Sequence, residues 1–175
     1  MATILFNSIL HVHYGQAYVL PKASHGFSIE AAFLGQENGL CGASIPEYLF
    51  LITGLHTGGV QFRVELHDHL PSDLDDWADV VEVPFSVCGP VNLEEWAAQA
   101  VYPLELPKGQ YRARYSANEM DAGKEVDTAT KGPDSYLLQF WPVDMQTRDT
   151  VIKQTSKQAE YWHQAWKRLE KRTNG

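Results

Sequence analysis

The segment VQFRVEL, residues 60–66, alternates between apolar and polar side chains over its whole length. Successive side chains on an extended chain point to opposite faces, so this pattern predicts a half-buried β-strand. An apolar run, YLFLITG at residues 48–54, precedes it, and HTGG at residues 56–59 lies between the two. This spacing predicts a β-hairpin over residues 48–66.

Most of the remaining chain also predicts short strands separated by turns. The candidates lie at residues 9–14, 16–20, 27–33, 80–87, 101–106, 110–117 and 136–141. Residues 91–98 fit either a strand or a short helical turn. Pro84 indicates a strand edge or a bulge within 80–87. Pro107 and Gly109 fit a type I turn that joins 101–106 to 110–117.

The C-terminal part of the chain changes to a helical period. Thr155 with Gln158 fits a capping box, and a stripe of apolar residues follows at helical spacing: Ala159, Trp162, Trp166 and Leu169. This pattern predicts one amphipathic helix over residues 155–172. Many short strands with one terminal helix indicate an all-β sandwich or barrel. We predict an antiparallel β-sandwich body, residues 1–150, on which the helix packs to give one domain over 1–175.

The charge of the chain is unevenly distributed. The net charge is −8, and from Val151 onward there are six basic and two acidic residues, which leaves 8 basic and 20 acidic residues in 1–150, a net −12. Phosphate contacts need a basic surface, so this balance argues against direct binding of nucleic acid. A strongly acidic body favours a basic protein partner, although solubility alone is an equally good explanation of the charge.

The densest acidic stretch is ELHDHLPSDLDDWADVVEVPF, residues 65–85. After Pro71 and Ser72 the run is too polar for a buried site, so we expect a solvated loop whose carboxylates stay ionised. Such a loop can present charge to a partner. The expected partner-binding residues are the four aspartates of the loop and two flanking acids: Asp73, Asp75, Asp76, Asp79, Asp68 and Glu82.

Two His-x-His pairs offer weak candidates for a metal site. An extended chain places both imidazoles of each pair on one face, and two such pairs with an acid could hold zinc. The four histidines are His11, His13, His67 and His69. The spacing does not show that the pairs meet, and surface histidines explain them more simply. A metal-dependent enzyme that uses both pairs is therefore an alternative function.

A small-ligand or carbohydrate-binding β-sandwich is the other alternative. Arg112 and Arg114 fall on one face of the predicted strand 110–117, and together with nearby aromatic residues they could form a sugar-binding shelf. Those aromatic residues are Trp77, Trp96 and Tyr111. A pocket with aromatic walls away from the acidic loop would favour this function.

The sequence also bears on the compartment of the protein. Residues 1–10, MATILFNSIL, lack a basic region before the apolar residues, so they do not resemble a secretory signal, and no apolar run is long enough to span a bilayer. A disulfide between Cys41 and Cys88 is possible, but nothing else in the sequence suggests a disulfide framework. We expect a cytoplasmic protein with free thiols, no membrane partner and no cofactor.

Three segments together resemble the ComJ-like competence-associated nuclease-inhibitor family of bacteria. In that family a strand with a Tyr-x-Gln core precedes a Val-Pro-Phe strand and a Leu-Pro-Lys-Gly-Asp/Gln-Tyr hairpin. The matching positions are Tyr14 and Gln16, residues 83–85, and residues 106–111. The resemblance covers roughly residues 11–118. The segments DSYLLQFWP (134–142) and QTSKQAEYWH (154–163) resemble uncharacterised bacterial proteins.

The resemblance implies a small cytoplasmic β-sandwich that inhibits a nuclease by binding it, with no catalytic residues. The acidic body is compatible with this role, because a nuclease cleft is basic in order to hold DNA. We therefore expect a non-enzymatic, acidic protein-binding module that inhibits a nuclease or a similar basic enzyme.

Overall fold

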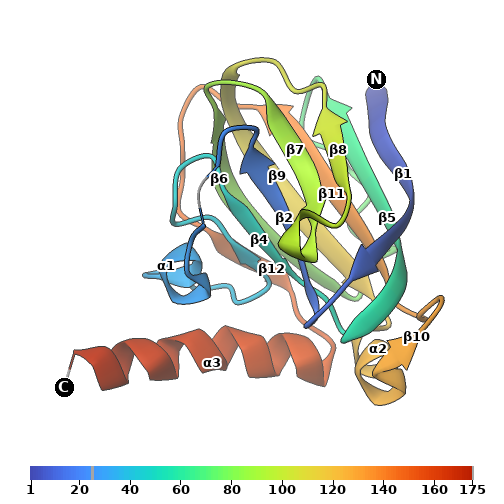
Figure 1. Ribbon diagram of the computed structural model, residues 1–175. Coiled ribbons are helices and arrows are strands. Elements are labelled where there is room, and N and C mark those ends of the chain that lie inside the picture. The colour runs from blue at the N-terminus through green and yellow to red at the C-terminus, as the bar shows by residue number, and fades with distance from the viewer. Residues whose placement is uncertain (25, 175) are drawn as a thin grey trace.

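The computed structural model describes residues 1–24 and 26–174 and shows a mostly β protein with two separate sheets (Figure 1). The larger sheet has the strand order β1-β5-β11-β9-β6-β12, and β10 also pairs with β5. Its strands are β1 (Ala2–Val12), β5 (Thr57–His67), β6 (Asp79–Val87), β9 (Gly109–Asn118), β10 (Thr128–Ala129), β11 (Ser135–Pro142) and β12 (Thr150–Lys153). The smaller sheet has the order β3-β4-β2-β7-β8. Its strands are β2 (Gln16–Pro21), β3 (Cys41–Gly42), β4 (Leu49–Ile52), β7 (Val91–Glu95) and β8 (Val101–Leu104).

The helices lie at one end of the sheets and beside them. They are α1 (Ile29–Phe33), α2 (Met120–Val126), α3 (Lys157–Thr173) and a 3-10 turn at Trp96–Ala98. Figure 1 shows α3 lying across the end of the two sheets, beneath α1 and next to α2. Neither sheet closes on itself. The all-β prediction with a C-terminal helix is thus confirmed in outline.

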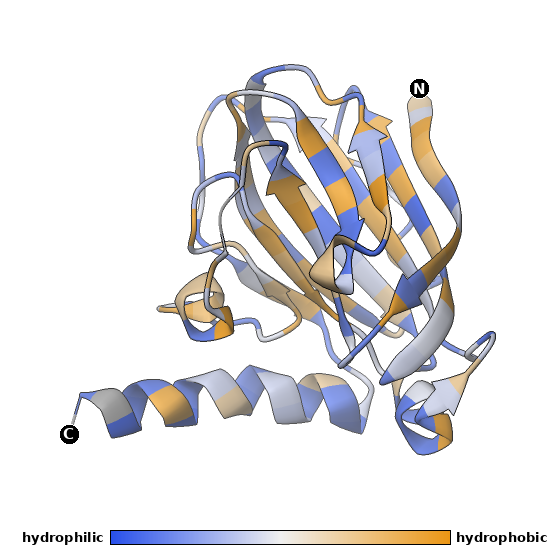
Figure 2. Ribbon diagram, in the orientation of Figure 1, coloured by the Kyte–Doolittle hydropathy of each residue, from blue (hydrophilic) through white to orange (hydrophobic). Residues whose placement is uncertain are grey.

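One hydrophobic core joins the two sheets. Inward-facing side chains from both sheets are fully or almost fully buried in one cluster that includes Leu10, Val19, Leu51, Phe62, Leu93, Tyr115 and Phe140. Tyr115 on β9 also donates a hydrogen bond to the carbonyl of Ile52 on β4, at 2.9 Å. Figure 2 shows the expected alternation of hydrophobic and hydrophilic residues along the strands. The period-2 pattern at residues 60–66 therefore does mark a strand with one buried face.

Both expected hairpins are wrong, because each links one sheet to the other. β4 and β5 do not pair: β4 lies between β3 and β2, whereas β5 lies between β1 and β11. The connection between them is fixed by tertiary hydrogen bonds, since Thr53 N donates to Gly15 O and Leu55 N donates to Asp134 Oδ2, each at 2.9 Å. β8 and β9 likewise fall in different sheets. Local alternation specifies a strand but not the sheet that it joins.

Three further expectations about the body need correction. The larger sheet is mixed rather than antiparallel, because β11 and β10 both run parallel to β5. The segment 27–33 contains α1 (Ile29–Phe33) instead of a strand, since the Ser28 hydroxyl caps the helix by accepting from Ala31 N. Residues 91–98 contain both a strand and a helical turn. Pro84 occupies the part of β6 beyond its pairing with β12, so it lies at an edge as predicted.

The C-terminal helix starts two residues later than predicted and is tied closely to the body. Ser156, rather than Thr155, is the N-cap, and its hydroxyl accepts from Ala159 N. Trp166 stacks on Phe33 of α1 with ring centroids 4.7 Å apart. A Cβ atom on Gly39 would lie 2.0 Å from the carbonyl oxygen of Trp162, so only glycine allows this approach of the loop to α3.

Cys41 is buried and Cys88 is exposed, and both are free. Within the described ranges, no helix has both the length and the apolar composition needed to cross a membrane.

Candidate functional site

The acidic segment, residues 68–78, is a crossover that passes over the outer face of the larger sheet. It connects β5 to β6, which are separated in the sheet by β11 and β9. β11 runs parallel to β5, and β9 is antiparallel to both β11 and β6, so β5 and β6 point the same way. Residues 68–78 must therefore run back along the length of the sheet, from the end of β5 to the start of β6. We call residues 68–78 the acidic crossover.

Arg114 on β9 anchors the middle of the acidic crossover. Its Nη1 donates to the carbonyl of Pro71 at 2.9 Å, and it lies 3.8 Å from Oδ1 of Asp73. Nε and Nη2 both donate to Oε1 of Glu82, at 3.0 and 2.9 Å. The guanidinium also lies over the Trp141 ring, 5.3 Å from its centroid. One buried cation thus joins β6, β9, β11 and the crossover.

Two amide side chains hold the rest of the acidic crossover. Gln139 on β11 donates from Nε2 to Oδ2 of Asp73 at 3.0 Å. Asn118 at the end of β9 donates from Nδ2 to the carbonyl of Asp76 at 2.9 Å and accepts from Ala78 N at 2.7 Å. The crossover is therefore fixed to the sheet at several points along its length.

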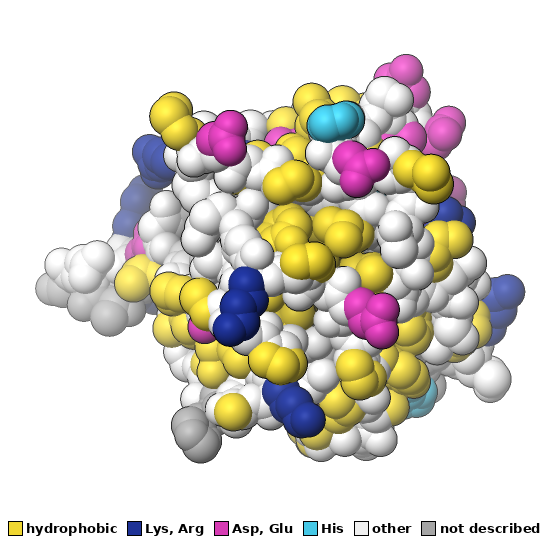
Figure 3. All heavy atoms as spheres, turned by 90° about the horizontal axis from the view of Figure 1, so that it is seen from above, with side chains coloured by type: hydrophobic (Ala, Val, Ile, Leu, Met, Phe, Trp, Pro, Cys, Tyr) yellow, Lys and Arg dark blue, Asp and Glu magenta, His cyan; other side chains and the backbone are white. Residues whose placement is uncertain are grey.

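The expected partner-binding acids divide into two groups. Asp75 and Asp76 are exposed, and the side chain of Asp73 is 42% exposed. Asp68 is also exposed and lies 3.0 Å from the N-terminal ammonium, whose hydrogen bond and charge lower the pKa of this carboxyl. Figure 3 looks onto this end of the molecule and shows acidic side chains gathered along its upper edge. These four aspartates can contact a partner.

Asp79 is not a solvated loop carboxylate, which corrects that expectation, and Glu82, which lies on a strand as expected, is not an exposed flank of the loop. Asp79 begins β6 and is fully buried, and its Oδ1 accepts from Thr155 N and Ser156 N at 2.7 and 3.0 Å. The side chain of Glu82 is only 13% exposed and is held by Arg114. Asp79 orients the start of α3, and Glu82 supports the anchor.

The two His-x-His pairs do not meet. His11 pairs with Gly59 and Ala2 pairs with His67 in the β1–β5 ladder, so the two pairs lie eight residues, or about 26 Å, apart along β5. His13 instead shares a hydrogen bond with Thr57. No three His, Cys, Asp or Glu side chains group as metal ligands in residues 1–24 and 26–174. A metal site built from both pairs is therefore wrong.

A polar network next to the acidic crossover was missed from the sequence. Glu65 on β5 accepts from Arg63 Nε at 2.5 Å and from Gln139 Nε2 at 3.0 Å, and lies 2.7 Å from His67 Nε2. Burial favours a higher pKa for Glu65, but the hydrogen bonds from Gln139 and His67 and the charge of Arg63 lower it overall. Gln139 is the lone polar residue in the apolar run 136–141. This polar residue in an apolar strand is the feature of the sequence from which a polar network could have been predicted.

The predicted sugar-binding shelf does not exist, but an aromatic hollow lies elsewhere. Arg112 and Arg114 are buried against Glu82, and Tyr111 points into the core. On the outer face of the smaller sheet, a hollow of about 480 Å³ has Tyr18, Phe27 and Phe50 among its lining residues, together with Gln16, Glu94 and Glu95. Burial raises the pKa of Tyr18 to about 12, so its hydroxyl stays protonated and donates to Gln16 Oε1 at 2.6 Å.

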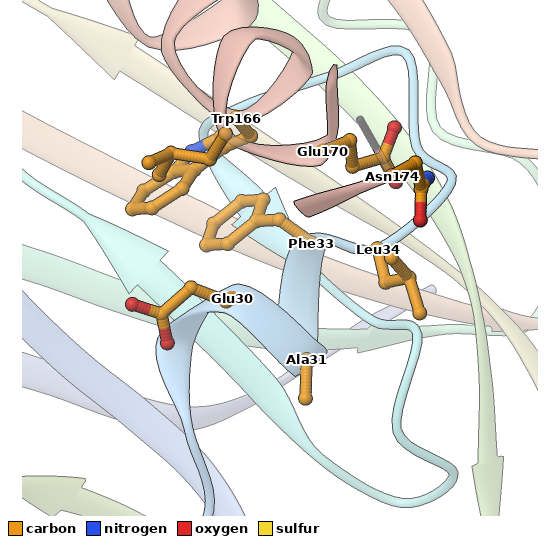
Figure 4. A pocket seen from close by; sticks show the side chains of 8 residues that line it. Glu30, Ala31, Phe33, Leu34, Trp166, Glu170 and Asn174 are labelled. Carbon is orange, nitrogen blue, oxygen red and sulfur yellow. The ribbon is translucent and has the colours of Figure 1, made fainter. Parts of the chain in front are cut away.

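A second hollow lies between α1 and the C-terminal half of α3. Its volume is about 250 Å³, and its apolar lining residues include Phe33, Leu34, Trp166 and Leu169. Figure 4 shows Glu30 on α1 and Glu170 on α3 at its margins. Glu170 also accepts a hydrogen bond from Gly35 N, which ties the end of α3 to the loop after α1.

The fold of this chain was compared with those of known proteins. No protein-family model and no curated protein matches the sequence. Among solved structures, the chain is similar to ComJ, the inhibitor of the DNA degrading activity of NucA from Bacillus subtilis, with a TM-score of 0.56 and 20% identity over 82% of this chain and 99% of that one. It is also similar to crocagin biosynthetic gene J, with a TM-score of 0.52 and 16% identity over 81% of this chain and 98% of that one.

The two TM-scores show a shared fold, and at identities of 20% and 16% they show the fold alone. The resemblance to ComJ-like proteins that residues 11–118 suggested is therefore confirmed at the level of structure, and it extends over most of the chain. One of the two similar structures is a nuclease inhibitor and the other is named for crocagin biosynthesis, so the fold alone does not assign an activity.

Proposed function

We propose that this protein is a non-enzymatic β-sandwich that binds and inhibits a basic, DNA-degrading nuclease. The observation that carries the proposal is the acidic crossover, which Arg114 and Asn118 fix to the sheet while Asp75 and Asp76 remain exposed. The likeness to ComJ, an inhibitor of the DNA degrading activity of NucA, supports the choice of partner.

The acidic crossover suits this task for a physical reason. A nuclease cleft concentrates positive charge to hold phosphates, so carboxylates on a fixed loop attract it and compete with DNA. Asp68, Asp73, Asp75 and Asp76 form the proposed contact set, and Glu82 serves by holding Arg114. A loop anchored before binding loses little conformational entropy in the complex.

The test measures capture and inhibition together. The protein is immobilised, nucleases from the source cells are captured and identified, and their DNA degradation is measured with and without added protein. We expect a basic nuclease whose activity falls as the protein is added. Capture by Asp75→Asn/Asp76→Asn should be about tenfold weaker at low salt and less sensitive to salt. A captured nuclease whose activity is unchanged by excess protein would contradict the proposal.

A matched control separates the acidic crossover from overall charge. Glu94 on β7 and Glu105 after β8 lie away from the crossover, on the side of the smaller sheet. Glu94→Gln/Glu105→Gln changes the net charge by the same amount as the aspartate variant. We expect it to leave capture almost unchanged. Equal weakening by both double variants would show that net charge, rather than the crossover, attracts the partner.

The aromatic hollow favours a second candidate function, the binding of a small ligand such as a sugar. Tyr18, Phe27 and Phe50 offer ring faces, and Gln16 and Glu94 offer hydrogen-bonding groups. Ligand-induced chemical-shift changes with a panel of monosaccharides test this function. Shifts confined to β2, β4 and β7 that disappear in Tyr18→Ala would support it, and a panel without such shifts would exclude sugars.

A further inference from the structure

Strand β1 forms one edge of the larger sheet and is unusually long for an edge strand. It spans eleven residues, Ala2–Val12, and in the described part of the chain it pairs with β5 alone. An edge strand presents unpaired backbone N–H and C=O groups along its free side, and these can pair with another strand. The free side of β1 is therefore a potential interface.

The other sheet edges carry features that discourage such pairing. β12 has four residues, a register shift and Lys153, β8 has four residues and Pro103, and β3 has two residues. Short length, lysine, proline and bulges are the usual protections of an edge. From Ala2 to Leu10, β1 contains neither a charged residue nor a proline. Its single irregularity is a register shift between Ile4 and Phe6.

That register shift does not protect the edge. It places two isoleucines on the same face of β1. Simple alternation would place Ile4 and Ile9 on opposite faces of the strand. In the ladder, Ile4 pairs with Glu65 and Ile9 pairs with Gln61, and these two residues of β5 share one face. Both isoleucines therefore lie on the outer face of the sheet, where they are 52% and 39% exposed.

The backbone of β1 also offers donors on its free side. His11 N donates to Glu95 Oε1 at 2.9 Å instead of to β5, so this amide points away from the sheet. Amide directions alternate along a regular strand, so the N–H groups of Asn7 and Ile9 point the same way. Glu95 caps only the end of the edge, and Asn7, Ser8 and Ile9 in the middle of β1 are exposed.

We propose that two copies of this chain pair through the free edges of their β1 strands. Antiparallel pairing of identical strands has the two-fold symmetry that most homodimers use, and it continues the larger sheet across both copies. At a net charge of −8 most surfaces of two copies repel each other, but residues 2–10 of β1 carry no charged side chain, so the two strands can approach. Ile4 and Ile9 of each copy would then cover apolar surface of the other.

Sedimentation velocity over a range of protein concentrations tests the proposal. We expect wild-type protein to approach twice the chain mass of 19.7 kDa as the concentration rises. Ile4→Lys/Ile9→Lys should stay at the mass of one chain, because lysines on the edge repel and solvate it. Asn7→Pro, which removes an amide that points to the free side, should do the same. Circular dichroism and thermal melting establish that each variant is folded.

The control places lysines on exposed apolar residues away from β1. Val126 on α2 and Met145 before β12 are 47% and 80% exposed. Val126→Lys/Met145→Lys should associate as the wild type does. Wild-type protein that remains a single chain at every concentration would overturn the proposal, as would association that survives Ile4→Lys/Ile9→Lys. Because these measurements need no nuclease, their outcome is independent of the proposed inhibitory function.

Discussion

Arg114 donates from both Nε and Nη2 to the same oxygen of Glu82, Oε1, at 3.0 and 2.9 Å. The two side chains are only 3% and 13% exposed, and the remaining Nη1 donates to the carbonyl of Pro71. A single ion pair therefore stabilises the sheet and positions the acidic crossover. Changes at Arg114 should affect stability and partner capture together.

Arg114→Leu should lower the free energy of unfolding by about 3 kcal/mol, because it leaves the Glu82 carboxylate largely buried with only the longer contact to Arg112. The Arg114→Leu/Glu82→Leu double variant should recover part of this loss, since it removes both charges. Urea denaturation followed by tryptophan fluorescence gives the two values. Capture of the partner should weaken in both variants, because each loses the bond to Pro71.

Arg63→Leu is the matched control for this ion pair. Arg63 also binds a carboxylate, Glu65, but its side chain is 41% exposed, so we expect a loss below about 1 kcal/mol. If Arg114→Leu costs no more than Arg63→Leu, the anchoring role assigned to Arg114 is wrong.

Asp79→Ala should destabilise the protein by about 2 kcal/mol, because the amides of Thr155 and Ser156 lose a charged acceptor inside the protein. Asp79→Asn should cost less, since its amide oxygen can still accept. Chemical denaturation measures both. The salt dependence of partner capture should be the same for Asp79→Asn as for the wild type, because this carboxylate is buried. If partner capture by Asp79→Asn depends less on salt than capture by the wild type, Asp79 does contact the partner.

The protein should lose stability as the pH falls below about 6.5, through His163. Burial lowers the pKa of His163 below its ordinary 6.5, and the charge of Lys167 acts in the same direction, against the opposing Asp79 and Asp149 carboxylates. Between the two pKa values the unfolded chain binds more protons, so unfolding becomes easier. In the folded state Nδ1 accepts from Gly39 N at 2.8 Å, which a protonated ring cannot do.

His163→Asn keeps an acceptor near the Nδ1 position without titrating. Melting temperatures measured from pH 5 to pH 8 should therefore vary less for this variant than for the wild type. His11→Asn, which changes an exposed histidine, should follow the wild-type curve. If the melting temperature of His163→Asn depends on pH as strongly as that of the wild type, a group other than His163 causes the loss of stability at low pH.

One thiol should react in the folded protein and two in the unfolded protein. Cys88 is exposed, whereas Cys41 is fully buried and burial raises the pKa of its thiol. Titration with a chromogenic disulfide reagent, with and without denaturant, counts them. Cys88→Ser should abolish the native reaction, and Cys41→Ser should leave it intact. Rapid labelling of both thiols in folded protein would contradict the burial of Cys41.

The sequence by itself determined most of the longer strands and the terminal helix. Alternation at residues 60–66, the apolar runs at 80–87 and 136–141, and the stripe from Ala159 to Leu169 record how each segment buries one side, which is a local property. It also located the acidic loop, because Asp73, Asp75 and Asp76 follow Pro71 and Ser72 in a stretch too polar to be buried as a whole. The resemblance over residues 11–118 also pointed to the fold that this chain shares with ComJ.

Only the tertiary structure decided which segments meet. Sheet membership depends on contacts between distant residues, such as Gly15 with Thr53, so two apparent hairpins became links between sheets. Asp79 resembles its neighbours Asp75 and Asp76 in sequence, yet it is buried because the start of α3, about 76 positions later, supplies its amide partners. Likewise, the register shift after Ile4 reverses the face that alternation assigns, because strand register is set by the partner strand.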